Sequence, residues 1–283
     1  MSSLTINQKT NYNGFPKAAE LIEITGAHQL EASDRALQNM LLQVAHDSGR
    51  MTEPDAEWEL TFAALRSGLS KHESNDRVRA SLDRLMSVQV TVHHKSKSGE
   101  CRTLKTHLLE FIDTGDGDSG NATVQYGIPK KLRLLLARSN RWGRVRCEVA
   151  FAMTSKYAIA LYELLCLRAN LQQCVESFSI DRFRELLGVP PGAYERGADF
   201  VRFVIEPALL EVNGLSDITV HIELRRRHAR APVHQVDIAW ERKQGDNFRA
   251  AIEERQRHKA GRKARLRGMA ETVVVELPPL PAA

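Results

Sequence analysis

The chain has 283 residues, of which 42% are hydrophobic and 27% charged. This composition excludes a disordered, collagen-like or coiled-coil protein, and the length leaves room for two domains. The formal charge of +5 hides an asymmetry, because residues 1–60 carry nine acidic and four basic side chains and the remainder totals +10. Such a basic majority favours a polyanionic partner, either nucleic acid or a membrane surface.

The cysteines and the N-terminus indicate a cytoplasmic protein. Cys101, Cys147, Cys166 and Cys174 show no C-x-x-C spacing, in a chain too long to need disulfides, so we expect reduced thiols. Residues 1–14 contain no apolar leader, and no apolar stretch approaches the 18 residues that a bilayer requires. We therefore expect no membrane partner.

The first half of the chain predicts one winged-helix domain. Residues 1–28 show little periodicity and are expected to form a flexible arm. The apolar spacing then predicts three short helices, after Ser33, around Trp58 and from Ser74 to Ser87, followed by a β-hairpin over residues 88–112. Three helices and a hairpin predict a winged helix over residues 29–138.

The second half repeats this order of elements. Residues 129–147 contain seven basic residues and no acidic one, and we expect a basic linker at 139–148. Helices are predicted after Ser155, over 180–187 and from Gly197 to Asn213, followed by two alternating strands joined by residues 225–232. This predicts a second winged helix over 149–242 and a basic, proline-rich tail over 243–283. The expected fold class is α+β, with two tandem winged-helix domains, a flexible N-terminal arm and a basic C-terminal tail.

The helix predicted from Gly197 to Asn213 has one apolar stripe and one charged face. The stripe contains Val201, Ile205, Ala208, Leu209 and Val212. Arg196, Asp199 and Arg202 lie at a spacing of three on another face. The third helix of a winged helix enters the major groove, where Arg bonds guanine and Asp accepts from cytosine or supports an Arg. The alternative is a solvated face held by an ion pair.

Two further basic segments are candidates for contact with DNA. Arg225, Arg226, Arg227 and Arg230 crowd the tip of the second hairpin, beside His228 and without an acidic residue, as expected for binding phosphates or a minor groove. In the first domain, the helix from Ser74 to Ser87 offers Ser74, Asn75, Arg77 and Arg79. We expect a weaker contact there, mostly with phosphates; the alternative is a scaffold for dimerisation.

The sequence offers little for an enzyme. Gly115, Gly117 and Gly120 match G-x-G-x-x-G, but the loop also contains Asp113, Asp116 and Asp118, which repel a pyrophosphate. The chain has no P-loop motif, and the adjacent His93 and His94 point to opposite faces of a strand and cannot chelate one ion together. We expect no catalytic activity, no metal and no cofactor.

Three segments resemble one known family. They are SKYAIALYELLCLR (155–168), FSIDRFRELLGV (178–189) and YERGADFVRFVIEPALLEVNGLSDITVHIELRRR (194–227). They resemble the iteron-binding plasmid replication initiators, the RepA, RepE and π class; residues 150–242 do so specifically and the first domain by its element order.

The resemblance implies a bacterial protein that binds double-stranded DNA at the direct repeats (iterons) of a plasmid origin. It implies that the second domain dominates binding and that the first adds a weaker contact and dimerisation. Monomers would help to open the origin with the host initiator, helicase and chaperones, and dimers would repress the protein's own gene. It assigns base contacts to Arg196, Asp199 and Arg202, and contacts with sugars or methyl groups to Phe200 and Phe203.

Two alternatives stay open at this stage. A dimeric winged-helix repressor without initiator activity uses the same fold, but binds an inverted repeat instead of direct repeats. A nicking enzyme of rolling-circle replication is disfavoured, because its His-hydrophobe-His metal pair is missing from the sequence.

Overall fold

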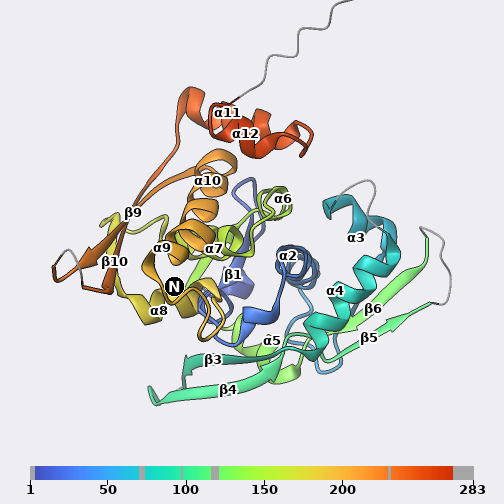
Figure 1. The fold of residues 1–283 in the computed structure, drawn as a ribbon. Helices are drawn as coiled ribbons and strands as arrows, with labels where there is room; N and C mark the ends of the chain where they lie inside the picture. Colours follow the sequence, from blue (N-terminus) through green and yellow to red (C-terminus); the bar gives the residue numbers. More distant parts are fainter. Residues whose placement is uncertain (1–3, 70–73, 97, 116–120, 229–230, 270–283) are drawn as a thin grey trace, which may run out of the picture.

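The computed structural model describes residues 4–69, 74–96, 98–115, 121–228 and 231–269. Two units of similar architecture pack together around a shared group of helices (Figure 1). Over the described ranges, no helix combines the length and apolar character needed to cross a bilayer.

The first unit is a winged helix with an additional hairpin. Its helices are α2 (Ala32–Asp47), α3 (Phe62–Leu69) and α4 (Asn75–Ser87), and its antiparallel sheet has the order β2 (Glu57–Thr61), β6 (Thr123–Gly127), β5 (Phe111–Thr114). Trp58 therefore lies in a strand, not in the expected helix, and its ring faces Tyr126 across the β2–β6 pair at 5.7 Å.

The hairpin predicted over residues 88–112 is not the wing of this unit. Strands β3 (Gln89–Lys95) and β4 (Cys101–His107) form a separate two-stranded sheet, which is bridged to the rest of the unit at Thr25 and Thr91. The wing is instead formed by β5 and β6. The alternation of β3 and β4 was visible in the sequence, but alternation does not specify the partner of a strand.

The second unit has the same topology. Its elements are α7 (Lys156–Arg168), β8 (Val175–Ser179), α8 (Ile180–Leu187), α9 (Gly197–Phe200), a π-helical turn η3 (Val201–Ile205), α10 (Glu206–Leu215), β9 (Ile218–Arg226) and β10 (Val233–Arg242). The sheet order β8-β10-β9 matches β2-β6-β5 of the first unit. The predicted fold class of two tandem winged helices is confirmed.

The prediction of a flexible arm is wrong for residues 4–28. This segment forms η1 (Thr5–Asn7), β1 (Phe15–Ala18), α1 (Ala19–Ile22) and η2 (Ala27–Gln29). Strand β1 pairs antiparallel with β7 (Trp142–Val145), which lies inside the expected linker. Gly14 precedes β1 with a φ of +108°, and a Cβ there would lie 2.2 Å from the Val145 carbonyl oxygen, so only glycine fits.

The two units share one core. Helix α2 packs against α6 (Cys147–Ala152) and α7, and α5 (Lys130–Ala137) packs against η1 and β1. A buried ion pair crosses this junction, with Lys17 Nζ 2.8 Å from Glu163 Oε1 and both side chains bonded to Asn39. The basic residues of the segment 129–147 are partly structural: Arg133, in α5, is buried and donates to the Met51 carbonyl.

The start of the tail is also folded. Helices α11 (Gly245–Gln256) and α12 (Arg262–Leu266) pack on the end of α10, at the top of Figure 1. The first part of the expected tail is therefore a packed helical hairpin, and the proline-rich end lies outside the described residues.

Candidate nucleic-acid interface

The N-terminal end of the third helix of the second unit presents an exposed charged surface. Arg196 is the N-cap of α9 and is exposed, Asp199 is half-buried in its first turn, and Arg202 is exposed in η3. Among the residues that the structure describes, no ion pair engages any of these three side chains. The alternative of an ion-paired, solvated face therefore has no support here, and both guanidinium groups are available to a ligand.

The two phenylalanines of this helix have opposite environments. Phe200 is only 2% exposed and lies under the Arg184 guanidinium, 5.0 Å from its ring centroid, so the expected DNA contact of Phe200 is wrong. Phe203 is 45% exposed, stacks on Tyr194 with centroids 5.6 Å apart, and carries the Arg202 guanidinium at 5.2 Å.

The π-helical turn explains why the predicted apolar stripe is out of register. A π turn inserts an extra residue and rotates the following positions around the helix axis. Ile205, Ala208 and Val212 of the predicted stripe are buried, but Val201 and Leu209 are only half-buried, and Phe200 and Val204 are buried in addition.

The loop before α9 is held in a strained conformation. Tyr194 has a φ of 54°, the left-handed region that a residue with a bulky side chain seldom occupies. Arg184 of α8 donates to the carbonyls of Tyr194, at 3.1 Å, and of Ala193. Tyr194 also interacts with Tyr157 of α7, and burial together with this interaction raises the pKa of Tyr157 to about 12. This support, beside which the Tyr194 ring stacks on Phe203, could not be predicted from the sequence.

The wing arginines of the second unit are not equivalent. Arg225 is bound to Asp237 at 2.7 Å and to Glu223 at 2.9 Å. Hydrogen bonds from Gln235 and then Arg225 hold the pKa of Asp237 well below its usual range. Arg226 donates to the Ala231 carbonyl at 3.0 Å and lies against Gly197, the first residue of α9.

Arg227 and His228 are exposed at the end of the described wing. Arg230 lies outside the described residues. Arg225 is therefore largely neutralised by its two carboxylates, and Arg227 is better placed to meet a phosphate.

The corresponding helix of the first unit offers fewer contacts than expected. Ser74 caps α4 and accepts a hydrogen bond from the Arg77 backbone N–H, and Arg77 is exposed. Asn75 is only 8% exposed, so its expected contact with DNA is wrong. Arg79 pairs with Asp76 at 3.3 Å and stacks over Phe62 at 4.8 Å. Ser74 and Arg77 remain as candidates.

A second surface, mostly basic, contains part of the basic segment 129–147. A groove of about 1460 Å³ lies between the β3–β4 hairpin, α5 and α8. Its basic lining residues are Lys95, Arg102, Lys131, Arg138, Arg141 and Arg182, and Glu20 and Glu23 also line it, with Glu23 3.4 Å from Arg141. The basic segment was visible in the sequence, but only the tertiary structure brings Lys95, Arg102 and Arg182 beside it. Within the described ranges, no group of three His, Cys, Asp or Glu residues could hold a metal ion.

Comparisons with known proteins agree with this architecture. A family model described as initiator replication protein, WH1, matches residues 16–166, and one described as initiator Rep protein, WH2, matches residues 179–240. Among solved structures, that of the Pi initiator protein in complex with iteron DNA has a TM-score of 0.59 at 14% identity, covering 81% of this chain and 97% of that one. The structure of domains 2 and 3 of RctB has a TM-score of 0.46 at 12% identity, and the match covers 75% of this chain and 83% of that one. The likeness to Pi, at this identity, concerns the fold.

Proposed function

Because the chain belongs to the family of initiator replication proteins, we propose that it initiates plasmid replication by binding direct repeats at the origin. The resemblance seen in residues 155–227 is confirmed by the two family models, and the chain is a DNA-binding initiator of the tandem winged-helix type. The observation that carries the proposal is the exposed N-terminal end of α9 and η3, where Arg196 and Arg202 have no acidic partner among the described residues.

The proposed contacts divide into two kinds. Arg196 and Arg202 enter the major groove and bond base edges, with Asp199 accepting from a cytosine amine. Phe203, held by the stacked Tyr194, packs against a thymine methyl group or a deoxyribose. Arg227 and, in the first unit, Ser74 and Arg77 bind phosphates, which position the protein without specifying sequence.

We further propose that the protein acts through binding energy and not through catalysis. Contacts from both units strain the duplex, so that A·T-rich DNA beside the repeats melts as host proteins load. The resemblance to iteron-binding initiators supports a monomer–dimer equilibrium, with the monomer bound at the repeats. It also supports autorepression by the dimer. The expected partners are the host initiator, helicase and chaperones, and the expected place of action is a bacterial cytoplasm.

The test is a footprint of the purified protein across the DNA that flanks its own gene, at two salt concentrations. We expect evenly spaced protection of direct repeats, each about two helical turns long and occupied by a monomer. A single symmetric patch occupied by a dimer would instead identify a repressor.

Two substitutions then separate base contacts from phosphate contacts. Arg202→Ala should cost about 1–3 kcal/mol of binding free energy on the protected repeat and little on random DNA. Arg227→Ala should weaken binding to both and reduce the slope of log affinity against log salt concentration by about 1. Arg249→Ala is the matched control, since Arg249 is exposed on α11, away from this surface. Equal losses for Arg202→Ala and Arg227→Ala on every sequence would refute the base contact.

A further inference from the structure

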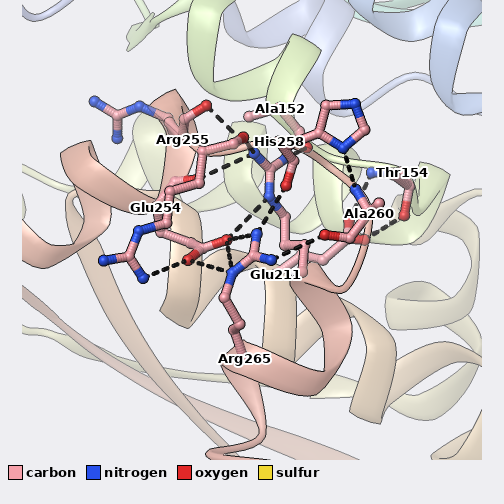
Figure 2. A network of polar contacts seen from close by, with 10 residues as sticks. Ala152, Thr154, Glu211, Glu254, Arg255, His258, Ala260 and Arg265 are labelled. Carbon is pink, nitrogen blue, oxygen red and sulfur yellow. Dashed lines mark hydrogen bonds and ion pairs between the residues drawn. The ribbon is translucent and has the colours of Figure 1, made fainter. Parts of the chain in front are cut away.

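The C-terminal helical hairpin lies beyond the segment that matches the family models. The WH2 model ends at residue 240, while α11 and α12 continue to residue 266 and fold back over the end of α10. Figure 2 shows the polar network in which they take part, with Glu254 and Arg265 in contact and Glu211 bonded to Thr154. This segment is basic, so its cations are candidates either for DNA or for the protein itself.

On the side of the second unit, these cations bind the end of the third helix. Lys243 donates to the carbonyl of Asn213 and, at 2.9 Å, to that of Ser216. Arg255 donates to the Leu215 carbonyl at 2.7 Å. The last carbonyls of a helix have no partner within it and carry partial negative charge, so cations are favourable there. The hairpin thus caps α10.

On its other side, the hairpin binds the end of α3 in the first unit and the end of α6, which packs on α2 and α3. Lys259 donates to the carbonyls of Leu69, at 2.9 Å, and of Phe151, at 3.0 Å. Arg262 donates to the Ala152 carbonyl at 2.8 Å. Leu69 is the last residue of α3, shortly before the chain enters α4, and Phe151 and Ala152 end α6. One hairpin therefore binds the end of the third helix of the second unit and the end of α3, the helix that precedes the third helix of the first.

The hairpin is held together by buried ion pairs of its own and packs closely on α10. Glu254 and Arg262 are 7% and 5% exposed, and Glu254 binds Arg265 at 2.7 Å and Arg262 at 3.4 Å. Leu266 lies so close to Gly214 that a Cβ at this glycine would be 2.3 Å from Leu266 Cδ2. Independently, Glu211 of α10 accepts hydrogen bonds from the backbone N–H groups of Thr154 and Ser155, both at 2.9 Å.

The position of the hairpin gives the two units a second point of attachment. Their first helices, α2 and α7, pack together near the centre of the molecule, whereas α11 and α12 lie at its top edge (Figure 1). Helices α1 and α2 pack on α6 and α7, and the Lys17–Glu163 pair joins the units in the same region. The hairpin adds an attachment at the end of α3, away from this core, and so further restricts the distance and angle between α4 and α10.

We propose that the α11–α12 hairpin, through Lys259 and Arg262, fixes the spacing between the two halves of the DNA site that the protein accepts. This inference rests on the proposed function. Since a helical turn of about 34–36 Å contains 10–10.5 base pairs, one inserted base pair moves a half-site by about 3.4 Å and rotates it by roughly 35°. A rigid pair of winged helices cannot follow such a displacement, whereas a loosely joined pair can.

The first experiment measures affinity for the repeat identified by the footprint and for duplexes with one, two or five base pairs inserted between its halves. We expect the wild type to lose at least tenfold in affinity on a one-base-pair insertion and Lys259→Met less than threefold. Lys263→Met is the matched control, because Lys263 is exposed on α12, four residues after Lys259 in the same hairpin, and it should behave as the wild type. An insertion penalty in Lys259→Met equal to that of the wild type would overturn the proposal.

A second measurement needs no DNA. Cys101 and Cys174 are exposed, one in each unit, whereas Cys166 is buried and burial raises the pKa of Cys147 to about 12, so spin labels will attach to the exposed pair at pH 8. The label-to-label distance distribution should be narrow in the wild type and Lys263→Met and broader in Lys259→Met. An unchanged width in a folded Lys259→Met would contradict the proposal. If Lys259→Met fails to fold, Lys259→Gln replaces it. If the distance distribution broadens in Lys259→Met but the wild type protects no repeat, the hairpin does fix the two units and the proposed function is refuted.

Discussion

Arginines of the same wing have different roles in this protein, because their neighbours differ. Arg225 and Arg227 are two positions apart in the wing, but Arg225 is held between Glu223 and Asp237 while Arg227 is exposed. Asp237 lies diagonally opposite Arg225 on the neighbouring strand and twelve residues away in sequence, so counting arginines in the hairpin could not distinguish them. The charge of the wing was predictable, and its distribution among partners was not.

The two phenylalanines of the third helix provide a test at this scale. Phe200→Ala should destabilise the protein by about 3–5 kcal/mol, since it empties a fully buried site. Phe203→Ala should cost only about 1 kcal/mol of stability, through the lost stacking on Tyr194. Urea unfolding of the two variants measures these costs.

Binding to the protected repeat completes the comparison. Phe203→Ala should weaken binding at a protein concentration and temperature where both proteins are folded. If Phe203→Ala is as destabilising as Phe200→Ala, the exposed ring is structural and its contact with DNA is wrong.

At the scale of elements, long periodic segments were predictable and short ones were not. Helices α2, α4, α7 and α8 and strands β9 and β10 are long enough for their period to show in the sequence. Strands β1 and β7 have four residues each, and their pairing joins positions about 127 apart, so no local pattern identified them. The π turn at η3 displaced the buried stripe by a rotation that a uniform helical period does not contain.

The strand β1 is anchored by an interaction that can be tested directly. Lys17 Nζ lies 2.8 Å from Glu163 Oε1 and both side chains are 2% exposed. Burial lowers the pKa of Lys17 although Glu163 opposes this shift. Lys17→Met should therefore cost about 3–5 kcal/mol, because it leaves an uncompensated carboxylate in the core.

A double variant separates the lost pair from the exposed charge. Lys17→Met combined with Glu163→Leu should recover much of the loss, since apolar replacements of buried pairs are often tolerated. Lys9→Met, at an exposed position of the same segment, is the control and should change the free energy of unfolding by less than about 0.5 kcal/mol. A small effect of Lys17→Met alone would contradict the anchoring role of β1.

At the scale of the whole molecule, the two winged helices form one cooperative structure. The buried residues of both units belong to one continuous cluster, and α2 of the first unit packs on α6 and α7. The expected picture of two domains joined by a linker at 139–148 does not include this, because β7 occupies part of that segment and pairs with β1. Unfolding one unit would expose apolar surface on the other, which favours a single transition.

Tryptophans in both units allow this to be measured. Trp58 lies in β2 and Trp240 in β10, both buried, so two variants that each retain one of them report separately on the two sheets. In each variant the other tryptophans are replaced by phenylalanine. Within each variant, the fluorescence of the retained tryptophan and the far-UV circular dichroism should then give the same urea midpoint. Two separate midpoints within one variant would mean that the units unfold independently. The rigid spacing between α4 and α10 would then depend on the C-terminal hairpin alone, and Lys259→Met should separate the midpoints further.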